Sequence, residues 1–180
     1  SRNVAIRASR GQFICALDAD DKIAPNYFLE AQKAVIADPS AGLLYGDQKF
    51  FGEGTFLWIV RDFDFLRPLA EGPLPVMSLY RRSYWDRVGG YSSALPRGNE
   101  DYDFWLKLVE IGAHSRRLRG IQSYYRVKKH SMMRDGAPFR QEEHVMMRLR
   151  HVGLFHPAQV LKDLRALQTL APSTEEILLQ

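Results

Sequence analysis

The spacing of hydrophobic and polar residues divides the chain into short apolar runs and longer segments with a helical period. Phe13 to Leu17 carries no charge and has the length of a buried strand in an α/β sheet. Phe50 to Val60 is aromatic and broken by two glycines, which predicts a hairpin or an irregular extended segment. Glu100 to Ile111 is the clearest helix, because its apolar residues recur every three to four positions. The other predicted strands cover residues 43–45, 76–80, 115–118 and 121–127, and the other predicted helices cover residues 2–9, 25–37, 62–69, 83–88, 138–150 and 157–170.

The order of these elements predicts the fold class. Strands and helices follow one another along the whole chain, which favours an α/β fold with a mixed sheet flanked by helices. The chain opens in what reads as the middle of a helix. It closes just after Ser173 to Glu176, which has the form of a capping box. Both ends therefore look cut from a longer protein, and we expect an incomplete sheet.

The composition of the chain indicates its cellular compartment and the classes of ligand that it could bind. Hydrophobic residues make up 46% and charged residues 26% of the chain, as in ordinary globular proteins. A single cysteine, Cys15, excludes an internal disulfide, and nothing indicates an oxidising compartment, so we expect a cytoplasmic protein. The net charge of +4 and the pI near 9.3 suit phosphorylated ligands or an anionic membrane surface. This charge is too weak to argue for nucleic acid.

The first candidate site is the acidic turn that follows the Phe13 strand. Asp18 and Asp20 are two residues apart, so they project to the same side of an extended backbone. In an open α/β sheet, ligands bind beyond the carboxyl ends of the strands. Carboxylate oxygens suit Mg²⁺ or Mn²⁺ held together with the phosphates of a substrate. The alternative is a solvated acidic loop that caps the next helix, a role that Asp21 also fits.

Two further candidates lie later in the chain. Glu100 and Asp101 open the Glu100 helix, where one of them could accept a proton, although acidic residues in a first turn are also favoured by the helix dipole. Asn99 is predicted to cap that helix. The third candidate is a basic cluster in which His130 could be a metal ligand and its cations could neutralise phosphate: Arg126, Lys128, Lys129 and His130. The remaining histidines are predicted to be surface or interface residues: His114, His144, His151 and His156.

The segment from Val160 to Leu170 predicts an amphipathic helix with two alternative roles. Its apolar stripe could pack on the rest of the chain or on a partner helix, which is the interpretation that we favour. The other role is peripheral contact with an anionic membrane surface, where a lipid-linked acceptor would be found.

Taken together and in this order, the motifs resemble glycosyltransferase family 2, which has the GT-A fold. The resemblance covers about residues 1–135. It rests on an R-N helix, an L-D-A-D-D strand end, an R-x-x-W-x-x-V-G-G-Y turn, an E-D-Y-D-F-W-L-K-L helix and a late Y-R…H-S-M segment: Arg2 to Ile6, Gly11 to Asp21, Arg82 to Tyr91, Glu100 to Leu108 and Tyr125 to Met132.

This resemblance implies roles for single residues. Asp20 matches the metal ligand of the family's D-x-D motif, and Asp18 would lie near the ribose or a metal-bound water. Asp101 matches the general base of inverting members, with Glu100 beside it to place donor or acceptor hydroxyls. His130 falls near a late position that contacts the metal or the diphosphate, next to Arg126. A glycine pair matches a turn that lets the backbone approach the sugar: Gly89 and Gly90.

The chain also departs from the family pattern. Members begin with a strand and turn that hold the nucleotide base, upstream of the R-N helix, and nothing in this sequence corresponds to them. The Q-x-x-R-W motif of processive synthases is absent after Asp101. The spacing of the last motif is looser, because two lysines separate Val127 from His130.

The resemblance implies an inverting, metal-dependent hexosyltransferase that moves one sugar from a nucleotide-diphosphate sugar to an acceptor hydroxyl. The acceptor would be a saccharide or a lipid-linked molecule in surface polysaccharide or lipopolysaccharide synthesis. Residues 1–135 would be the C-terminal part of the GT-A catalytic domain, lacking its N-terminal segment, and residues 136–180 a helical C-terminal extension. The main alternative is a non-catalytic fragment or a degenerate nucleotide-sugar-binding module, with a role in binding or assembly. A phosphatase of the haloacid-dehalogenase type is a weaker one, because Lys22 stands two residues after Asp20, where those enzymes carry Thr or Val.

Overall fold

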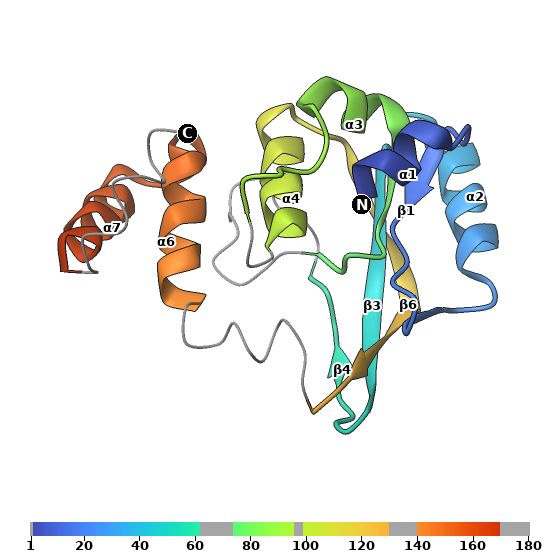
Figure 1. Cartoon of the computed structure of the whole chain (residues 1–180). Helices are drawn as coiled ribbons and strands as arrows, with labels where there is room; N and C mark the ends of the chain where they lie inside the picture. The colour runs from blue at the N-terminus through green and yellow to red at the C-terminus, as the bar shows by residue number, and fades with distance from the viewer. Residues whose placement is uncertain (1, 62–73, 96–98, 130–139, 170–180) are drawn as a thin grey trace.

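The computed structural model describes residues 2–61, 74–95, 99–129 and 140–169, without the side chains of 140–143 and 167–169. Within these ranges the elements follow the predicted alternation of strands and helices (Figure 1). They are α1 (Arg2–Ala8), β1 (Phe13–Cys15), β2 (Lys22–Ile23), α2 (Tyr27–Ala37), β3 (Leu43–Gly52), β4 (Leu57–Trp58), β5 (Leu79–Arg81), α3 (Arg82–Val88), α4 (Glu100–Glu110), β6 (Ser115–Val127), α6 (Arg140–Arg150), a 3₁₀ turn (Val152–Leu154) and α7 (Pro157–Thr169).

The strands form one mixed sheet in the order β1-β5-β3-β6-β2, with β4 paired to β3, which confirms the predicted fold class. β1 is antiparallel to β5, and β5 is antiparallel to β3, whereas β3 and β6 are parallel. It follows that β1, β3 and β6 run in the same direction. Their carboxyl ends therefore meet at one edge of the sheet, where α/β proteins bind ligands.

Helices cover both faces of the sheet, with α4 on one side and α2 on the other (Figure 1). The period-two alternation of the strands divides the core accordingly. Leu43 and Tyr45 belong to the cluster with α3 and α4, and the intervening Leu44 belongs to the cluster with α2. Phe104 and Trp105 of α4 are almost fully buried in the first cluster.

The structure differs from the predicted elements in several details. The strand predicted over 43–45 extends to Gly52 as β3, the one predicted over 76–80 is the shorter β5, and β2 was not predicted. The first strand ends at Cys15, and Leu17 is 49% exposed, because the chain turns where the backbone N–H of Asp21 donates to Asp18 O. The two strands predicted over 115–127 are one strand, β6, in which Gly120 has a φ of +82° beside a register shift against β3. Asn99 precedes α4 in a left-handed conformation and its side chain makes no capping hydrogen bond. The helix predicted at 62–69 lies outside the described residues.

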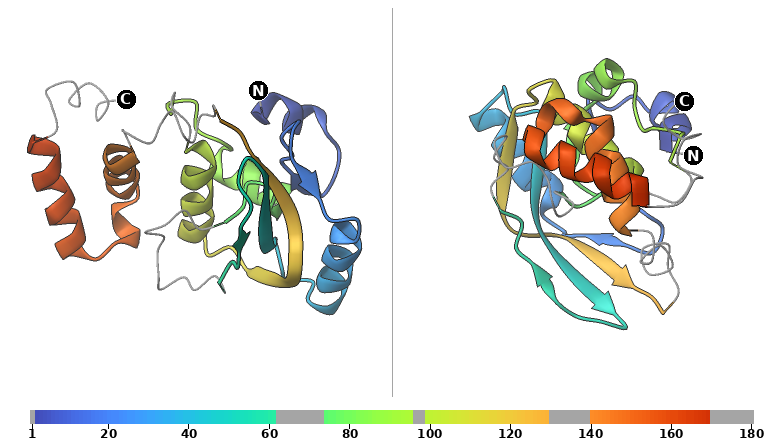
Figure 2. Two further views of the ribbon diagram at one scale, coloured as in Figure 1. Left: turned by 90° about the horizontal axis from the view of Figure 1, so that it is seen from below. Right: turned by 90° about the vertical axis from the view of Figure 1, so that its left-hand side faces the viewer.

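The α6–α7 pair lies beyond α4, on the side away from the sheet (Figure 2). Apolar residues of α4 pack on Met147 of α6, which is almost fully buried. The division of the chain at residue 135 stays a prediction, since that boundary falls between the described ranges.

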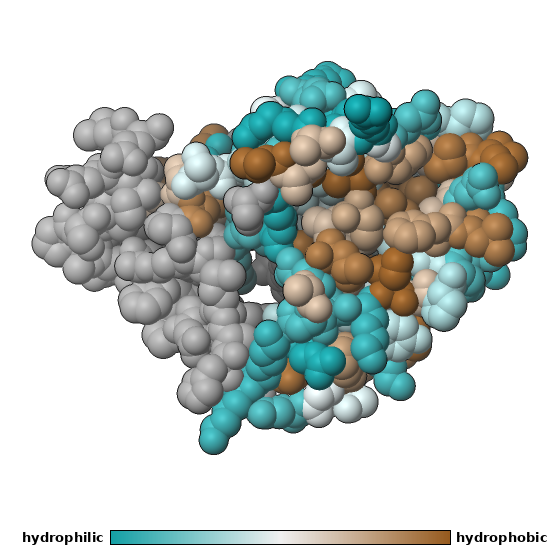
Figure 3. Space-filling model, turned by 45° about the vertical axis from the view of Figure 1, so that its right-hand side comes forward, coloured by the Kyte–Doolittle hydropathy of each residue, from teal (hydrophilic) through white to brown (hydrophobic). Residues whose placement is uncertain are grey.

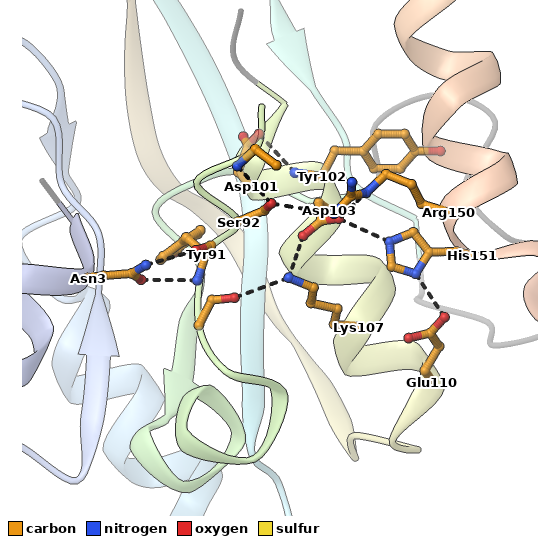
Figure 4. Close-up of polar contacts among 12 residues, drawn as sticks. Asn3, Tyr91, Ser92, Asp101, Tyr102, Asp103, Lys107, Glu110, Arg150 and His151 are labelled. Carbon is orange, nitrogen blue, oxygen red and sulfur yellow. Dashed lines mark hydrogen bonds and ion pairs between the residues drawn. The ribbon is translucent and has the colours of Figure 1, made fainter. Parts of the chain in front are cut away.

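A polar network next to this apolar contact ties α6 to α4 (Figure 4). Asp103 of α4 is fully buried and accepts from His151 Nε2 at 3.2 Å, while its other oxygen lies 2.6 Å from Lys107 Nζ. The second ring nitrogen of His151 lies 2.8 Å from Glu110 Oε1. Because both nitrogens face carboxylates, only the protonated ring can donate to both. His151 is therefore a residue of the interface between α4 and α6, in agreement with its predicted place at a surface or an interface.

We expect this network to make stability depend on pH. The hydrogen bonds to Asp103 and Glu110 outweigh burial and raise the pKa of His151 above its ordinary value of 6.5. A raised native pKa stabilises the fold fully below 6.5, and this stabilisation is lost as pH rises through the native value. Thermal unfolding of the wild type between about pH 6 and about pH 9 should therefore show a fall in Tm that His151→Gln largely removes. An unchanged pH dependence in this variant would contradict the assignment.

Of the apolar stripe predicted on the last helix, the described residues Leu161 and Leu164 are exposed, whereas Val160 is half-buried. Asp163 of α7 is almost fully buried against Arg148 of α6, whose Nε and Nη2 donate to it at 2.5 and 2.8 Å. This ion pair turns the polar side of α7 toward α6, and it leaves Leu161 and Leu164 56% and 45% exposed. For these two leucines the expected packing on the rest of the chain is wrong. Among the described helices, none is both long and apolar enough to cross a membrane.

Candidate functional site

The acidic turn Asp18–Asp21 lies at the edge of the sheet where β1 and β6 end. The backbone N–H of Arg126, near the end of β6, donates to Asp21 Oδ1 at 2.7 Å, and its Nε donates to Asp20 O at 3.1 Å. The Arg126 guanidinium also stacks over the Phe51 ring, 4.7 Å from its centroid. The first and third candidate sites of the sequence therefore share one location, as far as the described residues extend.

A single arginine joins this turn to the start of α4. Arg2 donates from Nη2 to Asp18 Oδ1 at 3.1 Å and from Nη1 to Glu100 Oε1 at 2.5 Å. The charges and hydrogen bonds of these acids outweigh burial and raise the pKa of Arg2. Arg2 thus bridges the first candidate site, at Asp18, and the second, at Glu100. The sequence analysis gave Arg2 no role in either site.

The neighbouring Asn3 fixes the loop that connects α3 to the site (Figure 4). Its side chain donates to Tyr91 O at 2.8 Å and accepts from Tyr91 N at 3.0 Å. Gly90 has a φ of +76°, and a Cβ there would lie only 2.9 Å from Asn3 Oδ1 and 2.7 Å from Trp85 Nε1. Gly89 has a φ of +74° and ends α3. The positive φ explains a glycine at both positions, and the close contacts add a second reason at Gly90, whereas the approach of these glycines to a sugar stays a prediction.

Asp101 is half-buried in the first turn of α4. Burial, and then the charge of Glu100, raise the pKa of Asp101 above its ordinary value of 3.8. The hydrogen bond that Oδ1 accepts from the Tyr102 N–H at 2.9 Å and the charge of Arg2 act in the opposite direction. A carboxylate with a raised pKa is a better proton acceptor than an ordinary aspartate.

Tyr125 of β6 connects Asp101 with the acidic turn electrostatically. Burial raises the pKa of this half-buried tyrosine, and the charges of four carboxylates raise it further: Asp21, Asp20, Asp18 and Asp101. Acids about eighty positions apart in the sequence therefore act on the same ring. The turn and the start of α4 therefore lie close together, as the contacts of Arg2 also show.

The donor atoms of the turn suit a hard divalent cation. Asp18 and Asp20 have side chains that are 46% and 36% exposed, and Asp20 Oδ2 lies 2.6 Å from Lys128 Nζ, which lowers the pKa of Asp20. Asp21 Oδ2 is buried without a hydrogen-bond partner, so an oxygen beside the turn is left for a ligand. Oxygen donors of this kind fit Mg²⁺ or Mn²⁺. Among the described residues, no group of three or more His, Cys, Asp or Glu side chains forms a metal site.

The structure brings one set of predicted site residues together at the sheet edge: Asp18, Asp20, Glu100, Asp101 and Arg126. His130 lies outside the described residues, so its predicted contact with a metal stays a prediction. Sequence reasoning missed Arg2, Asn3 and Tyr125 as parts of this site. The sequence signals that could have identified them were the R-N pair at Arg2 and Asn3 and the late Y-R pair that begins at Tyr125.

The fold is that of a GT-A-type domain. Two solved structures of TarS from S. aureus share the fold. TarS 1-349 in complex with UDP-GlcNAc has a TM-score of 0.60 and 20% identity over 82% of this chain and 45% of that chain. TarS 1-349 in complex with UDP has a TM-score of 0.57 and 20% identity over 81% and 42%.

The chain belongs to glycosyl transferase family 2, whose family model matches residues 1–93. A curated relative from Haemophilus influenzae, described as an uncharacterized glycosyltransferase, is 29% identical over 120 residues, which are 61% of this chain and 40% of the relative. The chain thus spans less than half the length of these relatives.

Proposed function

We propose that the protein transfers a single sugar from a nucleotide-diphosphate sugar to an acceptor hydroxyl, with inversion at the anomeric carbon. Family membership supports a glycosyltransferase that uses a nucleotide-sugar donor. The observation that carries the finer proposal is the meeting of the acidic turn with the start of α4 through Arg2. It places Asp18, which is proposed to act on the donor side, close to Glu100 and to the proposed general base, Asp101.

In the proposed reaction, Asp101 accepts the proton of the acceptor hydroxyl while the hydroxyl oxygen attacks the anomeric carbon. The bond between that carbon and the diphosphate oxygen breaks, and the diphosphate leaves with the electron pair. The cations of Arg126 and Lys128 lie beside Asp20 and would stabilise the negative charge on the leaving group. Glu100 would orient a hydroxyl of the donor or the acceptor.

Asp20 and Asp18 are the residues proposed to hold a divalent cation, Mn²⁺ or Mg²⁺, and Asp21 Oδ2 is a further oxygen beside them. When bound, such an ion supplies positive charge to the departing diphosphate. Lys128 would release Asp20 to accommodate it, because both would bind the same carboxylate.

A face of the domain is available for the expected N-terminal segment. Large apolar side chains are exposed on α1, just before the acidic turn and on α2: Val4, Leu17, Phe28, Leu29 and Ile36. Figure 3 shows hydrophobic surface on the side of the molecule where these elements lie. β1 is the edge strand of the described sheet beside them. We propose that this face packs against the base-binding part of the same domain.

The proposed setting is synthesis of surface polysaccharide or lipopolysaccharide in the cytoplasm, at the inner face of the membrane. Leu161 and Leu164 of α7 are exposed beside Lys162 and Arg165, a combination that suits weak binding to anionic lipid. We expect more of the protein to sediment with vesicles that contain phosphatidylglycerol than with neutral vesicles, and Leu164→Glu should remove the difference. Equal sedimentation with both kinds of vesicle would overturn this part of the proposal.

The activity is tested by release of UDP or GDP when the full-length protein is incubated with a panel of donors. The panel contains UDP-GlcNAc, UDP-glucose, UDP-galactose and GDP-mannose, each with Mn²⁺, with Mg²⁺ or with EDTA, and water or simple saccharides serve as acceptors. We expect release from at least one donor, dependent on the metal. Donor binding without turnover would favour the degenerate binding module instead.

A further inference from the structure

Arg2 occupies a position between the two halves of the proposed site. Its guanidinium contacts both carboxylate oxygens of Asp18, at 3.1 and 3.3 Å, and one oxygen of Glu100. The Arg2 side chain is 25% exposed, so this contact is shielded from water more than a surface ion pair. Asp18 and Glu100 are far apart in the sequence, and no other described contact joins their side chains directly.

The surroundings of Arg2 hold it in place. The guanidinium lies over the Tyr91 ring, with Cζ 5.7 Å from the centroid. Asn3, the next residue, is fixed to the backbone of Tyr91 by two hydrogen bonds. Further along α1, Ile6 is buried in the core and its carbonyl accepts from Arg82 Nη1 at 2.8 Å. Arg2 therefore projects from an anchored helix, and the geometry of its two contacts is defined by the fold.

We propose that Arg2 is a positioning residue for sugar transfer, which ties Asp18 on the donor side to Glu100 beside the base and so fixes the distance between the two halves of the site. This inference rests on the proposed function. Arg2 itself exchanges no proton and forms no bond to the sugar. It acts through the carboxylates that it holds.

The chemistry of the guanidinium explains why arginine stands there. Its planar fork offers separate N–H groups in fixed directions, so one side chain can bind two carboxylates simultaneously. Lysine keeps the charge but presents it at a single nitrogen, and it would bind one carboxylate at the expense of the other. A small error in the placement of reacting groups is costly, since about 1 Å can lower a rate by about 10²-fold.

The test compares Arg2→Lys and Arg2→Met with a matched control, Arg148→Lys. The control also weakens a two-bond arginine–aspartate ion pair, but that pair joins α6 to α7. We expect both Arg2 variants to lose about ten- to a hundredfold in kcat. Arg148→Lys should retain the wild-type kcat even if its Tm falls as much as that of the Arg2 variants. Calorimetric affinity for UDP should fall much less than kcat in the Arg2 variants, because the donor-binding residues themselves remain.

The pH profile separates positioning from general loss of structure. The charge of Arg2 lowers the pKa of Asp101, so Arg2→Met should move the acid limb of the kcat/KM profile to higher pH. Arg2→Lys keeps the charge, and its acid limb should stay near that of the wild type although its kcat falls. Adding Glu100→Gln to Arg2→Met removes a negative charge next to Asp101 and should move the limb back.

Each outcome decides a different claim. If the wild type releases nucleotide from no donor, the proposed function fails and Arg2 has no reaction to serve. If the wild type is active and the Arg2 variants match Arg148→Lys in kcat and in pH profile, the proposed function stands and the role of Arg2 is wrong. A loss of kcat in proportion to the loss of Tm in all three variants would also contradict positioning.

Discussion

Asp101→Asn is expected to lower the rate of sugar transfer by about 10²- to 10⁴-fold, the usual contribution of a general base. Asparagine keeps the size and the hydrogen bond to the Tyr102 N–H but cannot accept the acceptor proton. Donor binding should change little, because Asp101 is assigned to the acceptor side. The measurements are kcat from nucleotide release and the Kd of UDP by calorimetry, in the full-length protein.

The matched control is Asp86→Asn, an exposed aspartate on α3 outside the site. It should keep wild-type kcat. In the wild type, kcat/KM should fall on the acid side at a pH above the ordinary aspartate value of 3.8, because the pKa of Asp101 is raised. Turnover of Asp101→Asn near that of the wild type would reduce Asp101 to an acid that stabilises the start of α4.

Asp20→Ala is expected to abolish both transfer and the effect of the metal on donor binding. Changes in the outer shell of a metal site already cost 10- to 100-fold, so we expect a loss on the order of 10²-fold or more from a direct ligand. Alanine also frees Lys128, which lies 2.6 Å from Asp20 in the free protein and could bind phosphate itself. Affinity for UDP without metal should therefore persist.

The decisive readout for Asp20 is the ratio of UDP affinities with Mn²⁺ and with EDTA. We expect a ratio well above one in the wild type and close to one in Asp20→Ala. Asp38→Ala is a suitable control, because that aspartate pairs with His114 away from the site. A ratio that is unchanged in Asp20→Ala would remove Asp20 from the metal site.

Local sequence patterns predicted most of the regular structure. The helix over 100–111 was placed to within one residue of α4, since its apolar period reflects the face that packs on the sheet. Patterns of this kind report which side of an element is buried. They do not report where a strand stops, and Phe13 to Leu17 was drawn two residues too long because the turn at Asp18 depends on a backbone hydrogen bond.

Contacts between distant residues were the part that sequence could not provide. Arg2 lies 16 positions from Asp18 and 98 from Glu100, so no local pattern indicates that they meet. His151 and Asp103 are likewise 48 positions apart. The orientation of α7 could not be predicted for a related reason, because a buried ion pair between Arg148 and Asp163 decides which side of the helix faces α6.

The central claim is that Asp101 activates an acceptor for direct displacement of the diphosphate, which requires inversion. The most direct measurement uses water as the acceptor and follows the hydrolysis of a turned-over donor, such as α-linked UDP-GlcNAc, by proton NMR before the free sugar mutarotates. The account predicts that the β-anomer appears first and that Asp101→Asn suppresses it. First appearance of the α-anomer would contradict the account.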